Sequence, residues 1–131
     1  EIEQAGKVTN NGIILLNKSQ SVQRQRFTVM HELGHYLLGH VGSDPRFRDS
    51  GRTEEEQEAD RFAVGCLMPA CVLWALHATT AKEIAALCNV SMQAAEMRSR
   101  RMQILLARNK FLTHPLERQV FEQFQQFINN Q

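Results

Sequence analysis

Residues 26–36 read RFTVMHELGHY, and this stretch decides the fold. Apolar side chains recur through it at three- and four-residue steps, which is the period of a helix. Ser21 can cap the helix through its hydroxyl, and breaker residues follow from Gly39 onward, so we predict a helix from Ser21 to about Leu38. Because the apolar residues fill more than one narrow stripe, we expect this helix to be buried on most sides.

The centre of the stretch is His31-Glu32-Leu33-Gly34-His35, the pattern HExxH. Residues four apart on a helix are rotated by only about 40°, so the two imidazoles share one face and can bind one zinc ion. Glu32 lies roughly 100° further round, where it can act as the catalytic base toward the attacking water. Gly34 costs the helix roughly 1 kcal/mol, and close approach of another backbone or of a substrate would explain it. The pattern also occurs by chance on helix surfaces, but a buried histidine needs a partner.

A catalytic zinc ion needs a third protein ligand. We reject His40, because Gly39 and His40 each stand one place away from the pattern HExxHxxGxxH. A continued helix would also turn His40 away from the face of His31 and His35. The helix predicted to begin at Thr53 offers carboxylates instead, and its first turn is acidic, as the helix dipole favours.

Glu56 and Asp60 stand four residues apart on that second helix, with small alanines beside them that permit close approach. We therefore predict that Glu56 is the third metal ligand. Asp60 would accept the free ring N–H of a ligand histidine and fix its tautomer. Two alternatives stay open: Glu58 could be the ligand, and Glu56 could instead form a capping box with Thr53.

The other segments predict a mainly α protein of the α+β class. Residues 12–17 are an apolar run between turn residues, which predicts a short, well-buried strand. If that strand lies at a sheet edge, it could bind a substrate as an added strand. Residues 41–52 are polar and rich in breakers and predict a loop. Residues 80–103 predict a helical hairpin, and the apolar spacing after residue 115 predicts a terminal helix.

The length of 131 residues is typical of one domain. We expect a single domain over residues 1–131, with a zinc-binding core at 1–78 and a helical C-terminal subdomain at 79–131. The chain begins with Glu1 rather than methionine, so an N-terminal segment could be missing.

Composition excludes several classes of function. The net charge is +1, from 15 basic and 14 acidic side chains, which gives no general electrostatic attraction to nucleic acid or to a membrane. No apolar run is long enough to cross a bilayer. The three cysteines form neither a CxxC pair nor an even set, which favours reduced thiols and a cytoplasmic protein.

Three motifs follow one another in the chain: RFTVMHELGHY at 26–36, EQEADRFA at 56–63 and LMP at 67–69. In this order, after a short strand, they resemble the ImmA/IrrE family of metallopeptidases. The likeness covers roughly residues 12–107. Asp60 stands where many members of the family have asparagine, a departure compatible with a role beside a ligand histidine.

The resemblance implies a zincin-like helical core in which His31, His35 and Glu56 hold Zn²⁺, with Glu32 as the catalytic acid and base. It also implies a site-specific endopeptidase whose protein substrate is a helix-turn-helix transcriptional repressor of a mobile element, a prophage or a stress response. No residue of the sequence identifies that repressor, and the oligomeric state stays open.

Two other classes of function compete with a peptidase. The helical hairpin at 80–103 has the rhythm of a helix-turn-helix, but its second helix begins with Met92-Gln93-Ala94, where only Gln93 suits base reading. We therefore expect no direct binding to nucleic acid. The chain could also be a zinc-stabilised module that binds a regulator without cutting it, but such a site has no need of Glu32.

Overall fold

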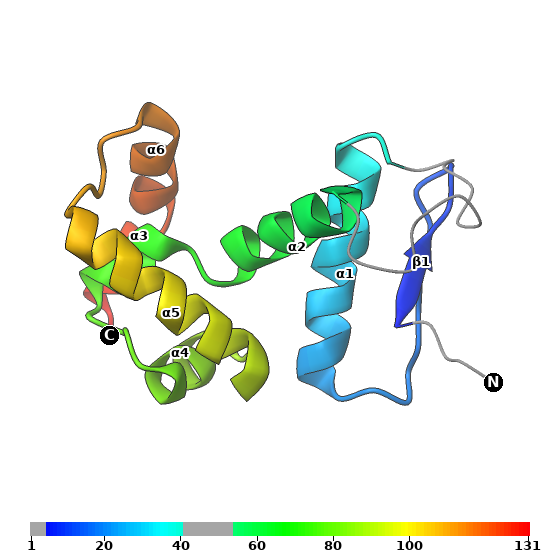
Figure 1. Ribbon diagram of the computed structural model, residues 1–131, viewed down its shortest axis with the longest axis horizontal. Helices are drawn as coiled ribbons and strands as arrows, with labels where there is room; N and C mark the ends of the chain where they lie inside the picture. Colours follow the sequence, from blue (N-terminus) through cyan, green and yellow to red (C-terminus); the bar gives the residue numbers. More distant parts are fainter. Residues whose placement is uncertain (1–4, 41–53) are drawn as a thin grey trace. The chain divides into compact units, whose positions relative to one another are not determined.

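The computed structural model describes residues 5–40 and 54–131 of the chain. The chain falls into two compact units, one ending at Leu67 and the other running from Met68 to Gln131. Most of the described residues lie in helices, and the first unit also contains a two-stranded sheet (Figure 1). The predicted fold class, α+β and mainly α, is confirmed. The predicted border between core and subdomain, at residues 78 and 79, lies inside the second unit.

The first unit opens with an antiparallel hairpin of β1 (Gly6–Val8) and β2 (Ile14–Leu16). Gly12 supplies the left-handed backbone conformation of the turn, with φ +85°, which glycine adopts without strain. The prediction of a well-buried strand was wrong, because Leu15 is 49% exposed and Leu16 38%. A two-stranded sheet covers little of its own surface, so apolar side chains of β2 stay in contact with solvent.

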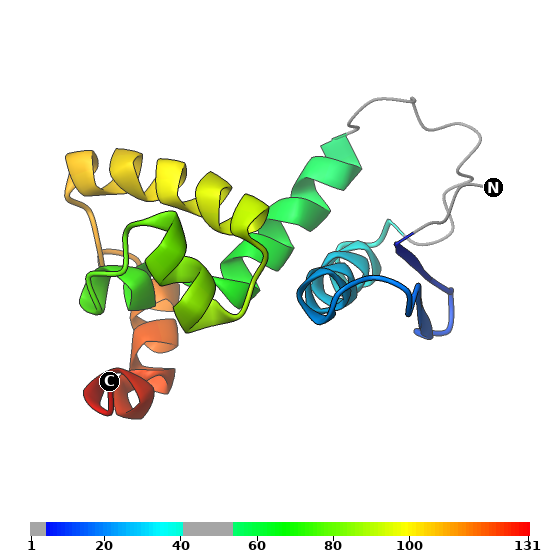
Figure 2. The ribbon, with the colours of Figure 1, turned by 90° about the horizontal axis from the view of Figure 1, so that it is seen from below.

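Helix α1 (Val22–Leu37) begins where the sequence predicts, since the Ser21 hydroxyl accepts a hydrogen bond from the Arg24 amide at 3.2 Å. It lies between the hairpin and the next helix, as the two views in Figures 1 and 2 agree. The expected burial on most sides holds for residues 25–35, all of which are buried or half-buried, whereas the two ends of the helix are exposed, with Val22 at 62% and Leu37 at 60%. The HExxH pattern lies in this covered part of the helix, and the exposed residues lie in its first and last turns.

Helix α2 (Glu54–Leu67) packs along α1, with Ala59 and Ala63 fully buried. The two helices come close together at Gly34 of α1. A β-carbon there would lie 3.0–3.2 Å from three atoms of Phe62, less than an ordinary carbon–carbon contact. The neighbour that explains Gly34 is therefore a side chain of α2, rather than the backbone or substrate that we expected.

The second unit consists of five helices, of which α5 with 17 residues is the longest, around a core whose largest fully buried side chains are Met68, Leu73, Ile84 and Met102. The hairpin predicted over residues 80–103 is confirmed, with a capping box at its start and Asn89 in the left-handed conformation at its turn. The predicted terminal helix is two helices that meet at Phe124. The bounds are α3 Ala70–Ala75, α4 Ala81–Cys88, α5 Met92–Arg108, α6 Pro115–Gln123 and α7 Gln125–Asn129.

Among the helices of the described ranges, none has the length and apolar character that a membrane span requires. The loop predicted at 41–52 lies outside the described residues, as does Thr53 of the proposed capping box.

Candidate metal centre

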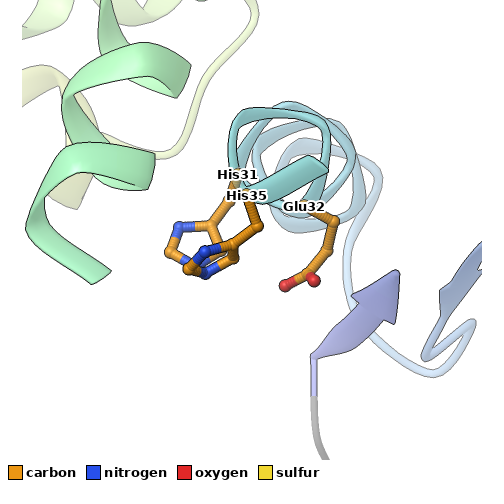
Figure 3. A group of neighbouring side chains, drawn as sticks. All are labelled: His31, Glu32 and His35. Carbon is orange, nitrogen blue, oxygen red and sulfur yellow. The ribbon is translucent and has the colours of Figure 1, made fainter. Parts of the chain in front are cut away.

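Helix α1 presents His31, Glu32 and His35 together. Their metal-binding atoms all lie within 4.8 Å of one another. Figure 3 shows the two imidazoles side by side, with the carboxylate of Glu32 next to them. The rings meet edge to face, with their Nε2 atoms 3.1 Å apart. This is the arrangement that a spacing of four residues predicts for one helix face.

A carboxylate from α2 completes this cluster. Glu56 Oε1 lies 3.2 Å from His31 Nε2, and Glu56 Oε2 lies 2.9 Å from His35 Nε2. The two histidines and Glu56 therefore meet at one point, although Glu56 stands 21 residues after His35 and 25 after His31 along the chain. The shared point is half-enclosed, because the side chain of His35 is 5% exposed and that of Glu56 is 29% exposed.

The other ring nitrogens of the two histidines also have partners. His31 Nδ1 lies 2.7 Å from Asp60 Oδ1. His35 Nδ1 lies 2.9 Å from Nδ1 of His40, a residue just beyond the end of α1. His40 Nε2 in turn lies 2.9 Å from Glu58 Oε1. His31 and His35 thus each turn Nε2 toward Glu56, while Nδ1 faces Asp60 in His31 and His40 in His35.

Negative charge dominates the surroundings of His31. Burial lowers the pKa of this histidine. The hydrogen bond to Asp60 and the charges of Asp60, Glu56 and Glu32 raise the pKa by more than burial lowers it, so it lies above the ordinary value. Three carboxylates that favour positive charge on an imidazole also attract a divalent cation.

The donor set fits a zinc ion. When Asp60 accepts the hydrogen on His31 Nδ1, a neutral His31 has a lone pair at Nε2, facing the carboxylate of Glu56. Such groups repel one another unless a proton or a cation lies between them. Their separations of 2.9–3.2 Å are near the roughly 3.3 Å between two ligands of a tetrahedral zinc ion. Two imidazoles and one carboxylate form a known ligand set of catalytic zinc.

The comparison with protein families agrees with this geometry. The model of the M78 peptidase family, described as the IrrE N-terminal-like domain, matches residues 3–100. The chain belongs to this family. The resemblance to ImmA/IrrE metallopeptidases is thereby confirmed, and the match spans the whole candidate centre. No curated protein and no solved structure gave a significant match.

In this member of the M78 family the residues predicted as ligands do come together. His31, His35 and Glu56 converge, and Asp60 contacts the outer nitrogen of His31. Glu58, the alternative ligand, instead contacts His40.

Sequence reasoning missed the position of His40, because it placed this residue by the helical angle although the helix itself is predicted to end at about Leu38. Gly39 adopts φ +80°, and the amide of His40 donates to the carbonyl of His35 at 2.8 Å, while the amide of Gly39 donates to that of Tyr36 at 3.3 Å. This pair of bonds is the Schellman motif. The motif reverses the chain direction after Gly39 and places His40 beside His35. A glycine at this position was the available signal.

Proposed function

We propose that this M78 peptidase is a zinc-dependent endopeptidase that cuts a specific cytoplasmic protein. The observation that carries the proposal is the meeting of His31 Nε2, His35 Nε2 and the Glu56 carboxylate within 3.2 Å, from two helices. Family membership supports a metal-dependent peptidase.

His31, His35 and Glu56 are the proposed zinc ligands. Glu56 is favoured over Glu58 because its two oxygens face both Nε2 atoms, whereas Glu58 contacts His40. Three protein ligands leave one position of a tetrahedral zinc ion open, as catalysis requires. Glu32 belongs to the same cluster, but its place directly after His31 suits a base beside the metal rather than a ligand.

The proposed mechanism follows from these positions. Zinc held at this site supplies a Lewis acid that makes water more acidic and polarises a peptide carbonyl. Glu32 takes the proton from the attacking water and delivers it to the leaving amine. Asp60 holds the hydrogen of His31 Nδ1 and so keeps the Nε2 lone pair directed at the centre.

The proposed substrate is a helix-turn-helix repressor that silences a mobile element, a prophage or a stress response. This part of the proposal is supported by the likeness to ImmA/IrrE peptidases, whose members cut such repressors. Narrow specificity is expected, because an unrestrained protease would damage the cell that makes it.

The proposed reaction is tested by incubating zinc-loaded protein with candidate repressors and following cleavage by mass spectrometry. Glu32→Gln is the matched control, because it retains the shape of the side chain and removes the base. We expect one specific cut with the native chain and a loss of rate of about 10²–10⁴-fold in the variant. Equal rates for the two proteins would refute the role of Glu32.

The ligand set is tested separately by measuring bound zinc in equilibrium dialysis against an excess of zinc. Glu56→Ala should lose stoichiometric zinc, whereas Glu58→Ala should still take up one ion per chain when zinc is in excess. The reverse result would make Glu58 the ligand and overturn our choice.

A further inference from the structure

His35 differs from His31 in what holds its outer nitrogen. Asp60 contacts His31 Nδ1 directly, at 2.7 Å, but the partner of His35 Nδ1 is another imidazole, that of His40, at 2.9 Å. His40 is 6% exposed, and its far nitrogen lies 2.9 Å from the Glu58 carboxylate. The side chains of His35, His40 and Glu58 therefore form a row of contacts from the candidate metal centre to helix α2.

When both imidazoles are neutral and Glu58 is ionised, the row has one consistent set of hydrogen positions, which we assign from the carboxylate inward. An ionised carboxylate only accepts hydrogen bonds, so His40 Nε2 carries a hydrogen toward Glu58. A neutral His40 then has a lone pair at Nδ1. Two nitrogens 2.9 Å apart share one hydrogen, which must belong to His35 Nδ1. The lone pair of His35 is thereby left at Nε2, facing Glu56 and His31.

We infer that His40 and Glu58 are positioning residues that fix the tautomer and the ring orientation of His35 for metal binding. The inference rests on the proposed zinc site and assigns work to two residues that sequence reasoning had left without a role or had considered as a ligand. Glu58 acts through His40, and His40 acts through His35, so neither touches the metal or the substrate.

The local fold explains how His40 is held beside His35. The Schellman motif fixes the backbone of His40 against the last turn of α1, through the bond from its amide to the His35 carbonyl. A hydrophobic contact commonly joins these two positions of the motif. Here the contact is between two imidazoles, whose ring centroids lie 5.1 Å apart. A cap that ends a helix thus also orients a side chain of the metal centre.

Both outer nitrogens finally lead to carboxylates of α2. Asp60 holds His31, and Glu58 holds His35 through His40, while Glu56 faces the two Nε2 atoms. Hydrogen-bonded carboxylates and carbonyls behind ligand histidines raise the basicity of the ligand and restrict the ring. Removing such a partner typically weakens metal affinity by about 10–100-fold.

The test is the zinc affinity of the full chain, measured by competition with a chromophoric chelator. His40→Phe keeps an aromatic ring in the buried position and removes both nitrogens, and we expect it to weaken zinc binding by about 10–100-fold. Glu58→Ala should weaken binding by a smaller factor, and Glu54→Ala, an exposed acid of the same helix, serves as the charge-matched control.

The visible spectrum of the Co²⁺-loaded protein is a second readout, because it reports the geometry of the ligands. We expect a changed spectrum in His40→Phe and an unchanged one in Glu54→Ala. If His40→Phe does not fold, Glu58→Ala carries the test, since the side chain of Glu58 is 39% exposed.

Coupling between the two residues distinguishes a row from two separate effects. Glu58→Ala should weaken zinc binding in the native background and have no effect in His40→Phe, because its influence passes through the His40 ring. Asp60→Asn, which acts on His31, should weaken binding to a similar extent in both backgrounds.

Two failures can be told apart. A native chain that takes up no zinc would refute the proposed metal site itself. A native chain that binds zinc, with His40→Phe and Glu58→Ala both within a factor of two of Glu54→Ala, would overturn only the role of His40 and Glu58.

Discussion

Replacing Gly34 by alanine tests how closely the two helices of the candidate metal centre must pack. A β-carbon at Gly34 would lie 3.0 Å from Phe62 Cδ2 and 3.1 Å from Phe62 Cβ. The ring of Phe62 can rotate away, but its Cβ is fixed to the backbone of α2. An ordinary carbon–carbon contact begins at about 3.5 Å, so a separation of 3.1 Å requires the helices to move apart by about 0.4 Å at this point.

Two effects with opposite signs decide the stability of this variant. Alanine gains about 1 kcal/mol over glycine in a helix interior. Overpacking a closely packed contact costs about 1–3 kcal/mol. We therefore expect the unfolding free energy of Gly34→Ala to fall by up to about 2 kcal/mol. The matched control is Gly65→Ala on α2, where an added β-carbon meets no atom within 4 Å, and this variant should gain about 0.5–1 kcal/mol.

Zinc affinity gives the second readout for Gly34→Ala, because Glu56 and Asp60 lie on the helix that must move. Ligand distances tolerate only about 0.2 Å, so we expect zinc binding to weaken by about tenfold. Urea unfolding of the metal-free protein and chelator competition measure the two effects. Stability equal to that of Gly65→Ala, together with native zinc affinity, would refute the packing argument.

Three further predictions concern protonation, the helix cap and the sheet edge. Because the pKa of His31 is raised above 6.5, the metal-free protein should lose stability to urea as pH rises through that pKa, with its full contribution present below 6.5; Asp60→Asn should flatten this loss. Zinc affinity should rise over the same pH range, since zinc must displace that proton, and a pH-independent affinity would contradict the assignment. Gly39→Ala places a β-carbon in open space at φ +80°, so it should lower the unfolding free energy by about 1–2 kcal/mol through backbone strain alone, whereas Gly39→Asn should be milder; equal losses would speak against strain. In the alternating hydrogen bonds of the hairpin, the amide of Ile14 points away from β1 and could pair with a substrate strand. Ile14→Pro removes this amide and should therefore reduce substrate affinity and cleavage. Unchanged peptide kinetics would exclude strand addition there.

Local patterns predicted the parts of this protein that depend on neighbours along the chain. The helix after Ser21, its hydroxyl cap and the shared face of His31 and His35 all follow from helical spacing and a capping residue. The convergence of Glu56 and Asp60 on that face was also predictable, because small residues beside them allow close packing.

Features that depend on contacts distant in the chain were not predictable in the same way. Residues 6–8 carry no strong strand pattern, and β1 forms because β2 and α1 offer it a partner and a surface. The exposure of Leu15 was missed, since an apolar run does not state how many strands cover it. His40 was misplaced because the helical angle was continued past Gly39, where the backbone reverses.

The burial of α2 decides which of its acids can face His31 and His35 in the candidate metal centre. Glu56 and Glu58 are separated by about 200° around the helix, so only one of them can face the two Nε2 atoms. Ala59 and Ala63 are both 0% exposed and lie on the side of Glu56. Turning α2 to present Glu58 would remove these alanines from their contact with α1 and place longer side chains there. The alanines therefore favour Glu56 as the acid that faces the candidate metal centre. Glu58 lies on another side of α2, where the chain that reverses after α1 places His40 in contact with it.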